Sequence, residues 1–312
     1  MIDNRKVPLS RRQFIKELCL LSAGIALMPK TVFGENRQPI THAIPSTGER
    51  LPVIGMGTSR TFDVGNDAAA MAELGQVLQI FFDEGGAVID SSPMYGSSEA
   101  MVGELLKKVQ NKKKLFAATK VWINGKENGI EQMQESMKLM GVSVMDLMQI
   151  HNLQDWKTHL PTLRQWQQEG KIRYIGITTS HGRSHDELMR IMRTEDLDFV
   201  QFTYNIGNRA AEDSLLPLAA DRGMATLINR PFQRGSLFRS VKGKALPECA
   251  REFDCNSWGQ FFLKFIVSHP AVTCVIPATS KAHHMRDNMA ANFGALPSAS
   301  MRKRMLEYFT SL

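Results

Sequence analysis

The chain has 312 residues, of which 43% are hydrophobic, 22% are charged and only four are cysteines. This length and apolar content can supply one large hydrophobic core or two smaller ones, and they argue against a disordered chain. Four cysteines are too few for a disulfide-stapled scaffold. The apolar run from Leu18 to Met28 is too short to span a bilayer, so we expect no stable membrane insertion.

The formal net charge of +7 is concentrated near the N-terminus, because the first 34 residues alone carry +4. The remaining +3 is ordinary for a soluble domain, and its basic residues are scattered apart from the run Lys112–Lys114. We therefore expect no nucleic-acid partner.

The N-terminal segment contains Ser10-Arg11-Arg12-Gln13-Phe14-Ile15-Lys16, followed by a weakly apolar stretch. This pattern resembles the bacterial twin-arginine (Tat) export signal, and Val32-Phe33-Gly34 fits a cleavage site. The alternative is a short amphipathic N-terminal helix. We expect residues 1–34 to be a signal peptide read by the Tat export machinery, and residues 35–312 to fold before export to the periplasm. Cys249 and Cys255 then either pair in that oxidising compartment or remain unpaired thiols.

Short apolar runs rich in β-formers recur along the rest of the chain at intervals of 25 to 31 residues, except before the last. Helical patterns lie between them; Met71, Leu74 and Val77, for example, share one helix face. This alternation predicts a parallel sheet covered by helices. The seven runs are 87–89, 115–118, 147–150, 174–177, 199–202, 225–228 and 272–276.

An eighth strand is needed before residue 87, near Leu51 to Gly57, or in a hairpin across the bottom of a barrel. With it, the pattern predicts an α/β fold, a (β/α)8 TIM barrel forming one domain, with an insertion over about 234–255. The alternative is an open doubly wound sheet. That fold usually carries G-x-G-x-x-G after its first strand, and Gly55-Met56-Gly57 lacks the third glycine.

The residues at the ends of three predicted strands, with one tyrosine in a loop, are suited to proton transfer at a carbonyl oxygen. Asp90, Lys120 and His151 end consecutive runs, and Tyr95 lies in the loop after Asp90. In a barrel the carboxyl ends of the strands form the active site. A phenol whose pKa is lowered by a neighbouring ammonium can transfer a proton to a carbonyl oxygen, and an imidazole can donate a hydrogen bond to it. Each residue alone could equally make a structural ion pair. We expect no metal site, because His283 and His284 are adjacent rather than spaced as ligands.

Several motifs resemble those of the aldo-keto reductases and occur in the family's order. They extend over about residues 40–292. The motifs are Asp90-Ser91-Ser92-Pro93-Met94-Tyr95-Gly96-Ser97-Ser98-Glu99, Thr119-Lys120, Met148 to Asn152 (MQIHN), Glu169 to Ile177 (EGKIRYIGI), Val200 to Asn205 (VQFTYN) and Val275 to Thr279 (VIPAT).

The resemblance implies a (β/α)8 barrel that uses NADP(H) to reduce the aldehyde or ketone group of a small molecule. By position, Tyr95 is the general acid, Lys120 and Asp90 tune it, and His151 orients the carbonyl. Asn152 and Gln201 take the place of residues that hold the nicotinamide carboxamide. The further cofactor-binding positions implied are Gly57, Thr58, Thr178, Thr179, Arg230, Ser280, Lys281 and Asn288.

Three departures from the family pattern concern the cofactor. Thr178-Thr179 stands where Ser-Asn is usual, and Asn229-Arg230 stands where an aromatic residue stacks on the nicotinamide. Arg230 either reaches a phosphate or makes a surface salt bridge. Ser280 and Lys281 fit a 2′-phosphate site, but the second basic residue of that loop is His284.

Two other functions stay open from the sequence. One is a nicotinamide-binding redox-sensing or regulatory protein with slow turnover, and the other is an unrelated barrel isomerase or lyase. We expect a monomer. The substrate is not identified, because substrate loops of this fold vary freely. Trp122 and Phe232, and also Phe62 and Trp156, are candidate pocket walls or core aromatics.

Overall fold

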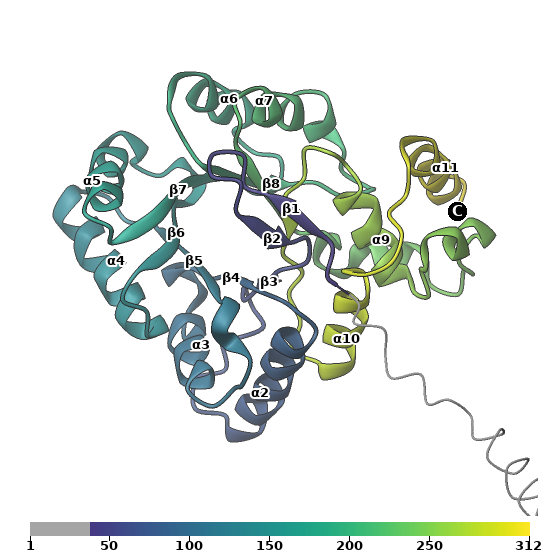
Figure 1. Cartoon of the computed structure of the whole chain (residues 1–312), viewed down its shortest axis with the longest axis horizontal. Helices are drawn as coiled ribbons and strands as arrows, with labels where there is room; N and C mark the ends of the chain where they lie inside the picture. Colours follow the sequence, from purple (N-terminus) through teal and green to yellow (C-terminus); the bar gives the residue numbers. More distant parts are fainter. Residues whose placement is uncertain (1–37) are drawn as a thin grey trace, which may run out of the picture. The chain divides into compact units, whose positions relative to one another are not determined.

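Eight short parallel strands form a closed ring in the computed structural model, which describes residues 38–312 (Figure 1). Their order around the ring follows the sequence from β3 to β10. The ring closes where Ile54 bridges Val275 and where the Gly55 amide donates to the Val275 carbonyl at 2.8 Å. The strands are β3 (Met56–Gly57), β4 (Val88–Asp90), β5 (Phe116–Val121), β6 (Met145–Ile150), β7 (Ile172–Thr178), β8 (Phe199–Thr203), β9 (Ala225–Asn229) and β10 (Cys274–Val275).

Helices surround the ring, as Figure 1 shows. They are α2 (Ala68–Asp83), α3 (Ser98–Leu106), α4 (Lys126–Met140), α5 (Trp156–Gln168), α6 (His185–Thr194), α7 (Leu215–Asp221), α8 (Ser236–Ser240), α9 (Trp258–Val267), α10 (Ala282–Ala290) and α11 (Ala299–Thr310). Short 3₁₀ helices occupy the loops: η1 (Pro93–Tyr95), η2 (Lys112–Lys114), η3 (His151–Leu153), η4 (Ala210–Glu212), η5 (Gln233–Gly235) and η6 (Glu248–Phe253). The expected insertion contains α8 and η6, and η5 lies at its start. The predicted (β/α)8 barrel is confirmed.

The chain before β4 supplies both of the elements that the sequence offered as alternatives. A hairpin of β1 (Thr41–Ala43) and β2 (Arg50–Pro52) pairs antiparallel, and β3 then opens the barrel. The hairpin covers the end of the barrel where the strands begin. There the Thr47 hydroxyl lies 2.8 Å from the Tyr174 hydroxyl on β7. The opposite end, where the strands finish, stays open to loops.

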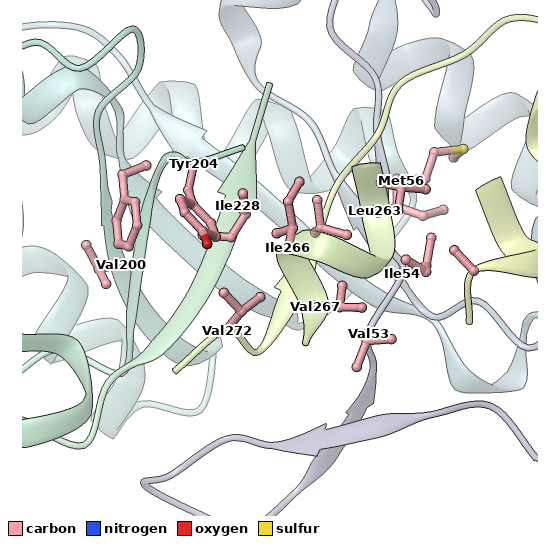
Figure 2. Packing of buried hydrophobic residues seen from close by; sticks show 14 of the residues in the cluster. Val53, Ile54, Met56, Val200, Tyr204, Ile228, Leu263, Ile266, Val267 and Val272 are labelled. Carbon is pink, nitrogen blue, oxygen red and sulfur yellow. The ribbon is translucent and has the colours of Figure 1, made fainter. Parts of the chain in front are cut away.

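Two layers of buried apolar residues hold the barrel together. The inner layer fills the ring and includes Phe116, Tyr174 and Phe199, whose rings lie 5.5–5.9 Å apart. The outer layer fills the space between strands and helices. Figure 2 shows part of it, where Leu263 and Ile266 of α9 lie with Ile54 and Met56 in the same cluster. This layer buries the apolar helix faces that the sequence predicted, including Leu74 and Val77 of α2.

The expected signal peptide and its cleavage site lie outside the described residues. Within residues 38–312, no helix is both long enough and apolar enough to cross a bilayer. Cys249, Cys255 and Cys274 are all buried free thiols. Cys249 and Cys255 therefore form no disulfide bond with each other in this structure.

Candidate active site

A tight turn after β4 presents Tyr95 at the open end of the barrel. Ser92 caps η1 by accepting a hydrogen bond from the Met94 amide at 3.2 Å. Gly96 follows with φ +59°, and a Cβ there would lie 2.4 Å from the Asp63 carboxylate, so only glycine fits. The Asp63 carboxylate accepts from the Ser97 amide and hydroxyl, each at 2.9 Å. These contacts fix the turn that carries the half-buried Tyr95 ring.

Lys120 and Asp90 form a buried ion pair directly below this turn. The Lys120 ammonium donates to Asp90 Oδ2 and to the Ser91 carbonyl, both at 2.6 Å, and lies 5.1 Å from the centre of the Tyr95 ring. Burial lowers the pKa of Lys120, but Asp90 and Tyr95 raise it by more, so the net shift is upward. The amine therefore stays protonated beside the phenol.

The pKa of Tyr95 differs from the expectation based on its neighbour. Lys120 does lower it, through its charge and a hydrogen bond, as the sequence suggested. Burial of the phenol is the larger effect and Asp90 adds to it, so the pKa of Tyr95 lies above its ordinary value. The expectation of a net lowering was wrong, because it considered the partner charge and not the loss of water. Tyr95 is a protonated phenol at neutral pH.

His151 completes the group as a neutral imidazole. It begins η3 directly after β6, and its ring meets the Tyr95 ring edge-on with centroids 5.9 Å apart. Burial and the charge of Lys120 lower the pKa of His151 to about 3. Its Nδ1 lies 3.0 Å from the Ser92 hydroxyl, which can donate a hydrogen bond to it. In the tautomer that accepts this hydrogen bond, the ring proton is on Nε2, the other nitrogen.

One buried carboxylate near this group escaped the sequence analysis. Glu99 on α3 accepts hydrogen bonds from Thr119 and, at 3.1 Å, from Ser136. Burial raises the pKa of Glu99, while these hydrogen bonds and Lys120 lower it by less. Glu99 is the last residue of the motif that begins at Asp90. In the sequence, only its place on the buried face of a helix could have indicated the hydrogen bonds to Thr119 and Ser136.

Four of the expected cofactor-binding residues, two of them expected at the nicotinamide carboxamide, lie on or just after β6, β7 and β8. Asn152 is exposed with φ +54°, and its backbone amide donates to the Thr178 hydroxyl at 3.2 Å. Gln201 is buried, and its side-chain nitrogen donates to Asp90 at 3.0 Å and to Gln149 at 3.1 Å. Gln201 can therefore offer a ligand only its carbonyl oxygen. Thr179 contributes a buried hydroxyl that has no hydrogen-bond partner within the described chain.

Gly57 and Thr58 line the seam of the ring rather than an open surface. The Gly57 amide donates to the Pro277 carbonyl at 3.0 Å, and a Cβ at Gly57 would lie 3.0 Å from the Ile276 carbonyl. The Thr58 hydroxyl lies 3.2 Å from the Asp90 carbonyl and 2.9 Å from the Ser91 hydroxyl, either of which can accept its hydrogen. These two residues hold the start of the β3 loop against the site.

Three arginines gather at the open end of the barrel. Arg230 follows β9 with φ +54°, Arg234 follows it in η5, and Arg60 follows β3. Burial lowers the pKa of the Arg230 guanidinium, and the charges of Arg234 and Arg60 lower it further. Within residues 38–312 none of the three makes a salt bridge, in contrast to the surface ion pair that was the alternative for Arg230. Like charges placed together in this way favour an anionic ligand.

The segment after β10 holds the remaining candidates. Ser280 is half-buried, and Asn288 is buried on α10. Lys281 makes a salt bridge of 2.8 Å with Glu73 on α2, and both side chains are largely exposed. His283 and His284 lie with ring centroids 4.2 Å apart, although adjacent helical residues were expected to point apart. No cluster of three or more metal-ligating side chains occurs in the described part of the chain.

The candidate pocket aromatics separate into two groups. Trp122 is exposed after β5 with its ring centroid 6.2 Å from that of His151, so it borders the site. Phe232 is half-buried beside Arg230 and packs on Phe238 at 4.8 Å. Phe62 is fully buried, and Trp156 packs against the Arg190 guanidinium of α6. Phe62 and Trp156 therefore serve in packing and do not line the site.

A buried ion pair, a protonated phenol and a neutral imidazole at the open end of a (β/α)8 barrel define a site suited to proton transfer at a carbonyl oxygen. The chain belongs to the aldo/keto reductase family, whose model matches residues 53–304. It is therefore a member of an oxidoreductase family.

The chain is also similar to individual reductases and to solved structures of this family. The chain is 24% identical over 257 residues to methylglyoxal reductase YeaE of Escherichia coli (strain K12), covering 80% of this chain and 89% of that protein. It is 26% identical over 196 residues to an NADH-specific methylglyoxal reductase of the same strain, covering 53% of this chain and 58% of that one. An aldo-keto reductase from Klebsiella pneumoniae, solved in complex with NADPH, has the same fold, with a TM-score of 0.70, 21% identity and 88% and 96% of the two chains covered.

Proposed function

We propose that this protein reduces the aldehyde or ketone group of a small molecule to an alcohol with NADP(H) as hydride donor. The observation that carries the proposal is the position of Lys120: its buried ammonium lies between the Asp90 carboxylate and the Tyr95 ring. An ammonium that bridges a carboxylate and a phenol keeps the phenol ready to give up its proton.

The side chains divide the work of the reaction. Tyr95 donates the proton to the carbonyl oxygen, and its anion is stabilised as it forms by the ammonium of Lys120. His151 is neutral, and its Nε2–H donates a hydrogen bond to the same oxygen. Asp90 holds Lys120 in place. When bound, the nicotinamide supplies the hydride that reduces the carbonyl carbon.

The residues present fit the nicotinamide end of the cofactor. The partnerless buried hydroxyl of Thr179 needs a polar partner, and a carboxamide would provide one. Asn152 is exposed, with its backbone bonded to the neighbouring Thr178, and Gln201 has one acceptor position left on its oxygen. Asn229 stands where the family stacks an aromatic ring, so polar contacts replace stacking on that face.

The residues present also fit the phosphates. Arg230, with Arg234 and Arg60 beside it, would bind the pyrophosphate, because a planar guanidinium binds phosphate oxygens bidentately. Ser280, Lys281 and Asn288 would bind the adenosine end, and Lys281 favours NADP over NAD by pairing with a 2′-phosphate. Lys281 must then exchange Glu73 for the phosphate. The support for NADP is this lysine together with the NADPH complex of the Klebsiella structure.

Export through the Tat pathway to the periplasm, as a folded monomer, belongs to the same proposal. It rests on Arg11-Arg12 and the apolar stretch after them. This route carries folded proteins, so the cofactor would be bound before export.

The test uses the mature protein purified from cells. We expect it to oxidise NADPH, followed at 340 nm, in the presence of small aldehydes such as methylglyoxal, and to yield the alcohol by mass spectrometry. Binding of NADPH without turnover on any of a panel of aldehydes and ketones would instead favour the redox-sensing alternative. No binding of either nicotinamide cofactor would disprove the proposal.

A further inference from the structure

The Asp90 carboxylate has two different environments at its two oxygens. Oδ2 accepts from the Lys120 ammonium at 2.6 Å. Oδ1 accepts from two side-chain amides, Gln149 Nε2 at 2.9 Å and Gln201 Nε2 at 3.0 Å. The two glutamines also contact each other, because Gln201 Nε2 lies 3.1 Å from Gln149 Oε1. Both oxygens of Asp90 are thus fixed by donors.

Neighbouring groups that can only accept hydrogen bonds determine which end of each side-chain amide is the NH₂ group. The Asp90 carboxylate pairs with the Lys120 ammonium through Oδ2 and accepts at Oδ1, so both glutamines present their NH₂ groups to it. At the other end, Asn229 Nδ2 lies 2.9 Å from the Thr179 carbonyl, which also only accepts, and 3.3 Å from Gln201 Oε1. Thr203 then donates to Asn229 Oδ1 at 2.7 Å. One consistent chain of hydrogen bonds therefore runs from β9 to Asp90.

Gln149 is the member of this chain that no ligand can reach. Its side chain is 0% exposed, inside the ring. It lies on β6 in register with Lys120 on β5, so the backbone places it next to the ion pair. Its second amide hydrogen faces the Thr119 carbonyl at 3.5 Å. Any effect of Gln149 on the reaction must pass through its neighbours.

We propose that Gln149 is a positioning residue for carbonyl reduction: it holds Asp90 Oδ1, so that Oδ2 stays aimed at Lys120 and Lys120 stays against Tyr95. The inference rests on the proposed reductase function. A carboxylate side chain can rotate, and a rotated Asp90 would leave the ammonium with the Ser91 carbonyl and the Tyr95 phenol but without a carboxylate partner. The hydrogen bond from Gln149 is charge-assisted, and both of its partners are buried, which strengthens such a bond.

The test is a double-mutant cycle that measures the coupling between Gln149 and Asp90, the residue through which Gln149 is proposed to act. Gln149→Met keeps the size of the side chain and removes both donor and acceptor. It is made alone and together with Asp90→Asn, and Gln167→Met serves as control. Gln167 also donates to an aspartate, Asp198 at 3.0 Å, but at the end of the barrel where β8 begins.

In the otherwise native protein we expect Gln149→Met to lower kcat by about ten- to a hundredfold, the usual effect of a lost hydrogen bond to a charged group. The Kd for NADPH should change by less than about threefold, since the Gln149 side chain is fully buried. In the Asp90→Asn protein the same substitution should change kcat by less than about threefold. Gln167→Met should leave kcat unchanged. Equal losses in both backgrounds, or a loss confined to KM, would overturn the proposal.

The urea midpoint of unfolding, measured for the same four proteins of the cycle, needs no activity. We expect Gln149→Met to lower the midpoint in the native background and to lower it much less in the Asp90→Asn background. An equal lowering in both would mean that Gln149 does not act on the charge of Asp90. If the native protein binds NADPH and reduces no carbonyl, the reductase proposal fails, and the midpoints still decide whether Gln149 holds Asp90.

Discussion

The Lys120 ammonium lies 2.6 Å from Asp90 Oδ2 in a part of the barrel where neither side chain exposes more than 2% of its surface. A buried pair of this kind stabilises little compared with an apolar pair, but it is costly to break on one side only. Each partner therefore depends on the other, and the phenol above them depends on both.

Removing the phenolic oxygen tests the proton donor. We expect Tyr95→Phe to lower kcat/KM for carbonyl reduction by about 10²–10⁴-fold, the usual contribution of a general acid. The Kd for NADPH should stay nearly unchanged, because the ring that lines the site remains. Stopped-flow binding and steady-state kinetics measure the two quantities. Near-normal turnover of this variant would show that another group gives the proton.

Replacing the ammonium tests how Lys120 acts on Tyr95. Since Lys120 lowers the pKa of Tyr95, Lys120→Met should raise that pKa further above its ordinary value. The variant should therefore show less tyrosinate absorbance at 295 nm than the native protein between pH 9 and 11, with Tyr95→Phe subtracted as the baseline. We also expect a loss of about 3–5 kcal/mol of stability, because Asp90 is left buried and unpaired. An unchanged titration of Tyr95 would contradict the tuning role.

The depressed pKa of His151 predicts a pH dependence of stability. The folded value is about 3, against about 6.5 for an unfolded histidine. The unfolded chain therefore binds the proton first, and the stability that the neutral ring contributes above pH 6.5 is lost as the pH falls toward 3. We expect His151→Asn to show a smaller drop in unfolding free energy between pH 7 and pH 4.5 than the native protein. Burial also lowers the pKa of His185, His269 and His284, but these residues are present in both proteins.

The pairing of Lys281 with Glu73 makes two opposite predictions for NADPH. Lys281→Ala should weaken NADPH binding by about ten- to a hundredfold and leave NADH little changed. Glu73→Gln should instead strengthen NADPH binding, by up to about fivefold, because it frees Lys281 from a surface ion pair worth at most about 1 kcal/mol. Fluorescence titration of both cofactors decides. Equal changes for NADH and NADPH would leave Lys281 without a role at the 2′-phosphate.

Changing the paired arginines tests the export signal. We expect Arg11→Lys combined with Arg12→Lys to retain the precursor in the cytoplasm, because lysine lacks the planar fork of the guanidinium. Fractionation of a bacterial host with a Tat pathway, followed by immunoblotting, locates the protein. Export at the native level would show that the pair is not the signal.

The barrel could be predicted because its strands are short apolar runs with even spacing. The order of the strands and the placement of Asp90, Lys120 and His151 followed from that spacing alone. Tyr95 was selected because it lies in the loop after Asp90, and the resemblance to a known motif supported its role as general acid, since a tyrosine in a loop has no pattern of its own. The direction of the pKa shift of Tyr95 could be determined only from the structure, because the adjacent residues in the sequence do not show how far a loop side chain is buried.

Other parts of the site depend on contacts between distant residues. Gln149 is a polar residue within an apolar strand, which marks it as unusual but does not reveal its partner. Lys281 and Glu73 are 208 positions apart, and charged residues on exposed loops and helices give no signal of pairing. Arg60 and Arg230 come together only because β3 and β9 both flank β10 in the closed ring.

The seam of the ring has a consequence for how the protein is made. β3 and β10 have two residues each, and the Ile54–Val275 bridge that joins them connects positions more than 200 apart. Such a contact between distant positions carries an entropic cost of loop closure. The barrel cannot close until Val275 has left the ribosome. Gly57 and Ser280, on the two sides of this seam, are candidate cofactor contacts, so a dinucleotide bound there would stabilise the closed ring.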